Sequence, residues 1–403
     1  EQSTDFSYFS QYKNFELHKM AADKLDIASP FFKVHDGLSS ATSIIAGREL
    51  VNFSSYDYLG INGDPRQIEK AETALHTYGV SSSASRMVSG EREIQRELER
   101  KLAALHGVAD AAVFVSGHAT NVSTIGSLFD HNDLIIHDEL IHNSVLEGIK
   151  LSRAQRSSFS HNNLQQLEKV LVDKRKQHRR VLIVVEGLYS MDGDFPDLVR
   201  LVALKNQHNA LLMVDEAHSL GVMGETGRGI AEYFSIDPTS VDIWMGTLSK
   251  ALASTGGYIA GSQALIDIVK TSVPGFVYSV GLAPVLAAAA VAAIDIMLEE
   301  PERVKNLQAN AALFDRLARD AGVDTGRNCG FSVIPIMAAG SASAAKSAEA
   351  LFKKGVNVQP IIYPAVEEKM ARLRFFICAS HSEAQIRQAV QALAEVKPLL
   401  TKS

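Results

Sequence analysis

The stretch LLMVDEAHS, residues 211–219, decides the fold class, because it places a carboxylate directly after a short, wholly apolar run. Residues 211–214 have the composition of a strand whose two faces are both covered, as in a parallel sheet. Open α/β sheets bind their ligands at the carboxyl ends of such strands. A buried, unpaired Asp215 would be costly, so it needs a permanent partner there, unless it only caps the helix that follows.

Similar apolar runs occur on both sides of this stretch. We predict further buried strands at 111–115, 133–137, 181–185, 243–245 and 258–260. Helix-like segments separate some of them, at 91–105, 163–174 and 197–206. Strands that alternate with helices are typical of a mainly parallel α/β sheet.

The pattern changes after an alanine-rich run at 282–294. That run has 13 residues, fewer than the about 20 that a membrane-spanning helix needs, so we predict a buried or interface helix and no membrane-spanning segment. A helix at 302–320, a strand at 331–337, a helix at 344–354, a strand at 372–377 and a last helix from Glu383 indicate a smaller α+β unit. We therefore expect an N-terminal arm (1–50), a large domain (51–290) and a small C-terminal domain (291–403).

Composition narrows the class of protein. The 403 residues include 40 basic and 46 acidic side chains, a net charge of -6 that argues against nucleic acid as a partner. Two cysteines, Cys329 and Cys378, form neither a disulfide framework nor a zinc cluster, which favours a cytoplasmic protein. His137 and His142 are five residues apart, about 140° on a helix, so we expect no metal site.

Lys250 also follows a predicted strand, near the start of a helix. A lysine in such a place is costly to desolvate unless it is neutral, paired or used covalently, for example as a Schiff base. The simpler reading is an exposed loop lysine. Together, Lys250 and Asp215 suit pyridoxal phosphate (PLP), whose ring stores electrons when a carboxylate keeps its nitrogen protonated.

Other polar residues after strand ends fit the rest of this cofactor. Ser116, Gly117 and His118 form a turn before an amphipathic segment, and Thr247 and Ser249 add hydroxyls that suit a phosphate. His118 or His142 could stack on the ring, although each alone is more typical of a surface or core histidine. The glycine-rich GETGRG at 224–229 lacks G-x-G-x-x-G spacing, which argues against an NAD-dependent enzyme.

Eight motifs in this order resemble the α-oxoamine synthase family. They are NFSSYDYLG (52–60), ASRMVSGE (84–91), SGHATN (116–121), HDELIHNS (137–144), EGLYSMDGD (186–194), DEAHS (215–219), GTLSKA (246–251) and RLRFFICASH (372–381). The family includes 8-amino-7-oxononanoate synthase, 2-amino-3-ketobutyrate ligase, 5-aminolevulinate synthase and serine palmitoyltransferase. The resemblance implies a PLP-dependent transferase fold of the aspartate-aminotransferase type (fold type I).

The resemblance also implies roles for individual residues. Lys250 becomes the Schiff-base lysine, Asp215 the partner of the pyridine nitrogen, His218 a neighbour of the phenolic oxygen and His142 the residue stacked on the ring. Further cofactor contacts are implied at Ser116, Gly117, His118, Glu186, Ser190, Thr247, Ser249 and Ser279. Arg374 matches the arginine that binds the amino-acid carboxylate, and Tyr56 and Ser85 lie in the substrate loops.

The family reaction joins an amino acid to an acyl thioester with loss of carbon dioxide, giving an α-amino ketone and a free thiol. Family active sites lie between two subunits, so we expect a homodimer in which a loop around Ser279 reaches across. The chain departs from the family at Tyr56, at Ser81 to Ser85, at Ser279 and around Tyr363. These departures, the polar arm and the first residue Glu1 suggest a fatty or polyketide-like acyl donor, carried on coenzyme A (CoA) or on an acyl carrier protein, and leave open a larger parent chain.

Three alternatives stay open at this point. An aminotransferase or a lyase of the same fold would share Asp215 and Lys250. A non-catalytic partner subunit is disfavoured because Lys250 is present, and a dinucleotide enzyme is disfavoured because its fingerprint is absent.

Overall fold

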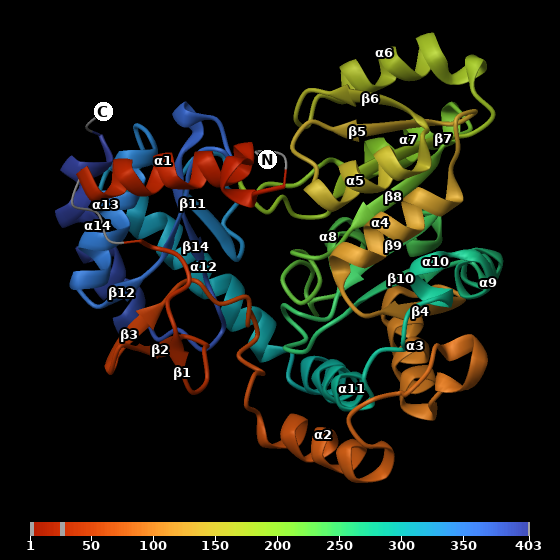
Figure 1. Ribbon diagram of the computed structural model, residues 1–403, viewed down its shortest axis with the longest axis horizontal. Coiled ribbons are helices and arrows are strands. Elements are labelled where there is room, and N and C mark those ends of the chain that lie inside the picture. The colour runs from red at the N-terminus through yellow and green to blue at the C-terminus, as the bar shows by residue number, and fades with distance from the viewer. Residues whose placement is uncertain (1–3, 25–28, 402–403) are drawn as a thin grey trace.

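The computed structural model describes residues 4–24 and 29–401 and has two lobes, which Figure 1 shows side by side. The larger lobe is built on one seven-stranded sheet of order β4-β10-β9-β8-β7-β5-β6. Its strands are β4 (Asp110–Phe114), β5 (Leu134–Asp138), β6 (Gln155–Phe159), β7 (Val181–Glu186), β8 (Leu211–Asp215), β9 (Ile243–Thr247) and β10 (Gly257–Gly261). Only β10 runs antiparallel to its neighbours among these strands. The predicted mainly parallel α/β fold is confirmed.

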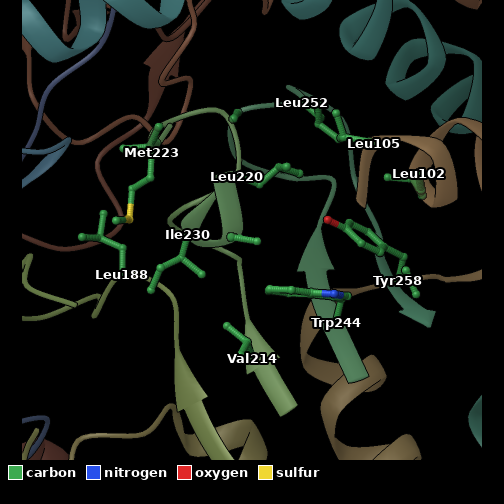
Figure 2. Packing of buried hydrophobic residues seen from close by; sticks show 14 of the residues in the cluster. Leu102, Leu105, Leu188, Val214, Leu220, Met223, Ile230, Trp244, Leu252 and Tyr258 are labelled. Carbon is green, nitrogen blue, oxygen red and sulfur yellow. The ribbon is translucent and has the colours of Figure 1, made fainter. Parts of the chain in front are cut away.

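Helices cover both faces of this sheet, so its strands are mostly apolar except for the edge strand β6. One face packs against α2 (Pro65–Tyr78), α3 (Glu93–His106), α6 (Leu164–Lys174), α7 (Leu198–Gln207), α8 (Ile230–Phe234) and α11 (Pro284–Glu299). The other face packs against α4 (Gly117–Leu128), α5 (Asn143–Ser152), α9 (Gln263–Ser272) and α10 (Pro274–Val277). Figure 2 shows Val214, Trp244 and Tyr258 of the sheet meeting Leu102 and Leu105 of α3 on the first face.

Strand β6 is absent from the sequence-based prediction. Its sequence QRSSF is polar, and four of its five residues are exposed or half-buried, because β6 lies at the edge of the sheet. An edge strand has one free side and needs no continuous apolar run. The alanine-rich helix was predicted as buried, and α11 is indeed buried along most of its length against α2 and α3.

The smaller lobe has its own core. Strands β11 (Val333–Met337), β14 (Arg372–Phe376) and β13 (Gln359–Ile361) form an antiparallel sheet that packs with α12 (Glu302–Asp320), α13 (Ser341–Lys353) and α14 (Glu383–Leu400). All of these elements except β13, which was not predicted, lie close to their predicted ranges, because their apolar periodicity is regular.

Part of the N-terminal region joins this lobe. Strands β1 (His35–Asp36), β2 (Thr42–Ile45) and β3 (Arg48–Asn52) form a sheet with β12 (Val356–Asn357), and β3 runs parallel to β12. Helix α1 (Ser10–Lys24) precedes them. The second half of the predicted arm thus shares a sheet with the C-terminal part, while the division into 1–50, 51–290 and 291–403 stays a prediction.

In the described part of the chain, no helix has both the length and the apolar character that crossing a membrane requires.

Candidate active site

The carboxyl ends of three neighbouring strands bring the first site residues together. Glu186 ends β7 and Asp215 ends β8, and the two are register partners in the sheet. Thr247 ends β9, the next strand along. Side chains at such strand ends face the loops that follow, so the carboxylates lie beside each other at the edge where ligands bind.

Asp215 is held in place by an amide network. The residue is 4% exposed, its Oδ2 accepts from Asn121 Nδ2 at 3.0 Å, and its Oδ1 accepts from the Ala217 backbone at 2.9 Å. The same Asn121 amide donates to Ser144 Oγ at 3.0 Å, and Ser144 Oγ lies 2.7 Å from His142 Nδ1. Because Ser144 Oγ accepts from Asn121, its own proton points to His142, which links the ring to Asp215.

Glu186 is the second buried carboxyl. It is 3% exposed, its Oε2 accepts from the Ser190 backbone at 3.1 Å, and its Oε1 is buried with no partner among the described residues. Burial, together with the charge of Asp215, raises the pKa of Glu186 to about 8. A ligand with a donor group would satisfy this oxygen.

Lys250 lies against His218 and Tyr56. Its Nζ is 3.0 Å from His218 Nε2 and 5.5 Å from the centre of the Tyr56 ring. Burial lowers the pKa of Lys250 to about 8, although the nearby Asp215 and Glu186 oppose the shift. The amine is therefore available in its neutral, nucleophilic form near neutral pH.

His218 carries no charge at neutral pH. Burial and the positive charges of Lys250 and Arg374 hold its pKa well below the usual value. His142 caps the N-terminus of α5. Desolvation of its buried part lowers the pKa of His142; the charge of Asp215 opposes this shift and the positive charge of Lys250 adds to it. Both rings are therefore neutral hydrogen-bonding groups.

A phosphate-sized cradle forms at the start of α4. Ser116 caps this helix by accepting from the Ala119 backbone, and the first N–H groups, on Gly117 and His118, are those that a helix cannot use internally. Thr247 and Ser249 place their hydroxyls 2.8 Å apart. A Cβ on Gly117 would come within 3.2 Å of Thr247 Oγ1, so the glycine keeps the backbone and the hydroxyls close together.

Arg374 reaches the site from the small lobe. One of its terminal nitrogens donates to Ser190 O at 3.0 Å, its guanidinium lies 4.8 Å from the Phe376 ring, and its Nε is buried without a partner among the described residues. The positive charge of Arg374 contributes to the lowered pKa of Lys250, His142 and His218, so the guanidinium lies near all three groups. A bidentate carboxylate would use its free donors.

Two predicted residues are not brought into this cluster. Ser85 forms a β-bridge with Val280, and Ser279 Oγ donates to the Val280 carbonyl at 3.2 Å. No hydrogen bond or ring contact in the described part of the chain joins either serine to Lys250. The Ser85–Val280 bridge brings the segments of the two serines together.

The structure adds residues that the sequence-based prediction missed. Asn121 and Ser144 organise Asp215 and His142, and Tyr58 contacts His218 with its hydroxyl. All three stand inside motifs that define the family resemblance. The sequence carried a signal for them, but nothing in it showed which partner each would meet.

One cluster has the composition of a metal site, formed by His161, Asp192 and Asp194. Both ring nitrogens of His161 already face carboxylates, Asp138 at 2.9 Å and Asp194 at 2.8 Å, and Asp192 pairs with Arg372 at 2.5 Å. These contacts occupy both nitrogens of His161, although Asp194 Oδ1 is buried without a partner among the described residues, and the absence of a metal stays a prediction.

The residues present fit PLP. Asp215 offers a buried carboxylate for a protonated ring nitrogen, Lys250 an amine for the aldehyde, and the start of α4 with Thr247 and Ser249 a cradle for the phosphate. His142 lies within electrostatic reach of both Asp215 and Lys250. Among the described residues, Glu186 Oε1 and Arg374 Nε have no hydrogen-bond partner, so one acceptor and one donor of this site are available to a ligand.

Comparison with known proteins supports this assignment. Residues 48–393 match the family model described as aminotransferase class I and II. A putative 8-amino-7-oxononanoate synthase of Rippkaea orientalis is 40% identical over 362 residues, which is 89% of this chain and 93% of that protein. The 8-amino-7-oxononanoate synthase 1 of Bacillus subtilis is 37% identical over 346 residues, covering 86% of this chain and 88% of that protein.

Solved structures agree. The serine palmitoyltransferase of S. paucimobilis with a bound PLP–myriocin aldimine has a TM-score of 0.93 at 27% identity, covering 98% of this chain and 99% of that one. The 8-amino-7-oxononanoate synthase of Francisella tularensis has a TM-score of 0.75 at 25% identity, covering 87% and 98%. The predicted fold and family are therefore confirmed: the chain belongs to the aminotransferase class I and II family and, within it, to the α-oxoamine synthases.

Proposed function

We propose that this chain is a PLP-dependent acyltransferase, which condenses an amino acid with an acyl thioester and releases carbon dioxide and a free thiol. The observation that carries the proposal is the meeting of Lys250, His218 and Asp215 at the carboxyl ends of the parallel strands. Bound PLP supplies an electron sink for the α-carbon of the amino acid. The relatives named 8-amino-7-oxononanoate synthase and serine palmitoyltransferase support this class of reaction.

Each residue has a task that its surroundings suit. Lys250 would hold the cofactor through its amine, and the same amine in its neutral form would take the proton from the α-carbon. Asp215 accepts the hydrogen bond of the ring nitrogen, while Asn121 keeps the carboxylate oriented. His142, Glu186 and Ser190 would contact the cofactor, and Arg374 would bind the amino-acid carboxylate. Tyr56, beside Lys250, borders the entry of the substrate.

Reduction with borohydride tests the cofactor assignment. The protein loaded with PLP should show a visible absorption band, and borohydride should fix the cofactor on the peptide that contains Lys250. Lys270, which pairs with Glu99 at 3.0 Å, is a control lysine that should stay unmodified. Cofactor fixed elsewhere, with Lys250 free, would overturn the proposal.

Product analysis separates the synthase from an aminotransferase. Incubation with an amino acid and an acyl thioester should release carbon dioxide and thiol in equal amounts. Transamination releases neither, so an exchange of amino groups without thiol release would favour the alternative.

We also propose that the acyl group arrives on an acyl carrier protein. The support is the set of departures from the family in the substrate loops, including Tyr56 and the segment around Tyr363, both exposed. Turnover should be faster with carrier-bound acyl groups than with the same acyl group on CoA. Equal rates with both donors would remove this part of the proposal.

A homodimer in the cytoplasm completes the proposal. Ser85 and Ser279 lie outside the cluster around Lys250, next to exposed apolar side chains such as Val88 and Tyr278. In a dimer these serines would contribute to the partner's site, as the family resemblance implies. The two cysteines are free, which suits a reducing compartment.

A further inference from the structure

A buried chain of hydrogen bonds runs from Tyr58 through His218 to Lys250. Tyr58 Oη lies 2.7 Å from His218 Nδ1, and His218 Nε2 lies 3.0 Å from Lys250 Nζ. Tyr58 is 0% exposed and His218 is 6% exposed. Each nitrogen of this imidazole therefore has a fixed partner, and bulk water is not one of them.

The fold holds Tyr58 firmly in this position. Its backbone carbonyl accepts from the Ala379 backbone at 2.7 Å, just beyond β14 of the small lobe. Its ring lies 6.1 Å from the ring of Phe376, also on β14, and His218 packs against the same Phe376 at 6.3 Å. Tyr58 thus connects the small lobe with a residue of the large lobe that touches the reacting lysine.

The hydrogen-bond chain can be arranged in two ways. A neutral imidazole carries one N–H, and either Nδ1 or Nε2 can hold it. With the proton on Nδ1, the ring donates to Tyr58 and accepts from a charged Lys250. With the proton on Nε2, Tyr58 donates to Nδ1 and the ring donates to a neutral Lys250 amine.

Physical chemistry favours the second arrangement. A phenol is a far stronger acid than a neutral imidazole N–H, so the bond is stronger when Tyr58 donates. A doubly protonated ring is disfavoured, because burial and then the positive charges of Lys250 and Arg374 hold the pKa of His218 well below its usual value. Above about pH 8, where most of the Lys250 amine is neutral, it can accept from Nε2, whereas its ammonium form can only donate to that nitrogen.

We propose that Tyr58 is a positioning residue that sets the tautomer of His218, keeping the proton on Nε2 and aimed at Lys250 and the atoms that react there. The inference rests on the proposed function for its catalytic meaning, since it takes Lys250 as the reacting amine. The tautomer itself is a property of the chain without cofactor. It can therefore be measured separately.

Nitrogen-15 NMR of histidine-labelled, cofactor-free protein, recorded above about pH 8 where most of the Lys250 amine is neutral, tests the inference directly. The His218 signals are assigned by comparison with His218→Gln. In the unchanged protein, Nδ1 should show the chemical shift of an unprotonated, hydrogen-bonded nitrogen and Nε2 that of an N–H. Tyr58→Phe should abolish this preference and give a mixture of tautomers.

Tyr258→Phe is a matched control. Tyr258 is also 0% exposed, and its hydroxyl lies 2.7 Å from Nε2 of His106 in the core between the sheet and α3. This variant loses a comparable buried bond without touching His218. Its His218 signals should match those of the unchanged protein.

Kinetics give a second readout. Because Tyr58 acts through His218 and not on the substrate, Tyr58→Phe should lower kcat about tenfold with the KM for the amino acid unchanged. Tyr258→Phe should leave both constants as they are.

A proton on Nδ1 in the unchanged protein would overturn the inference, and so would a Tyr58→Phe variant with the original tautomer. If Tyr58→Phe does not fold, the spectrum of the unchanged protein still decides. Failure of borohydride to label Lys250, with the predicted tautomer observed, would contradict the proposed function and not this inference.

Discussion

Asp215 and Glu186 show how single residues determine the chemistry of this chain. They end neighbouring strands and are both buried, yet they have different partners. Asp215 accepts two hydrogen bonds, one at each oxygen, which fix the orientation of its carboxylate. Glu186 receives one from the protein at Oε2 and leaves Oε1 unpartnered, and its pKa is raised to about 8. The two carboxyl groups therefore differ in their hydrogen-bond partners although both end neighbouring strands.

Replacement of Asp215 tests its assigned role. Asp215→Asn removes the charge that keeps the cofactor nitrogen protonated, so kcat should fall by about 100-fold or more. The visible spectrum of the bound cofactor should change as well. Steady-state kinetics and absorbance measure both effects.

Asp133→Asn provides the control for that substitution. Asp133 is equally buried, but it binds Arg179 and Arg180 at the opposite end of β5. Its replacement should lower stability while kcat stays unchanged. Equal losses of kcat in the two variants would contradict the role of Asp215.

At the scale of elements, the loop from Glu186 to Asp194 connects three parts of the molecule. Its carbonyls at Ser190 and Met191 accept from Arg374 and Arg372 of β14. A Cβ on Gly193 (φ 68°) would come within 1.9 Å of the Val333 carbonyl of β11, so only glycine fits there. The far end of the loop is fixed by His161, which bridges Asp194 to Asp138 at the end of β5.

This bridge should make stability depend on pH. Although burial opposes it, hydrogen bonds from Asp138 and Asp194 raise the pKa of His161 to about 10, above its usual 6.5. The stabilisation is fully present below about pH 6.5 and is lost as the pH rises towards about 10. The free energy of unfolding in urea, followed by the fluorescence of the single Trp244, should fall across this range.

His161→Gln should remove that pH dependence and lower stability at neutral pH. His131→Gln, at an exposed position, serves as the control and should retain the slope. A slope that persists in His161→Gln would show that other groups cause it.

At the scale of the whole molecule, the site is assembled between lobes. Lys250, His218 and Asp215 come from the large lobe, while Arg374 comes from β14 and Tyr58 is bonded to the backbone just after β14. Ser85 and Ser279 lie outside this cluster. A backbone bond between Gly281 and Ala84 joins their two segments into one surface that exposes Val88 (81%) and Tyr278 (85%).

Charged substitutions on this surface test the proposed dimer. Val88→Asp or Tyr278→Asp places a charge in the interface, so sedimentation should show monomers and activity should be lost. Val172→Asp, at a position on α6 that is 64% exposed, should remain dimeric and active. Active dimers of Val88→Asp would exclude this surface as the interface.

Some features could be predicted because they depend on local pattern alone. The buried strands β4, β5, β7, β8, β9 and β10 are apolar on both faces, and the helices α12 and α14 have regular apolar periodicity. Strand β6 and the short strands β1 to β3 were missed. Their stability comes from pairing with distant strands, as β3 pairs with β12 some 300 residues later (Val51 with Val356), and local sequence does not record this.

The sequence by itself determined the fold class, the family and the set of polar residues at strand ends, because these depend on apolar runs and on ordered motifs. Only the tertiary structure decided which of those residues meet. It placed Tyr58 on His218, Asn121 on Asp215 and Arg374 beside Ser190, and it left Ser85 and Ser279 on a separate surface. The physical reason is that hydrogen-bond partners and desolvation are set by the packing of segments far apart in the chain.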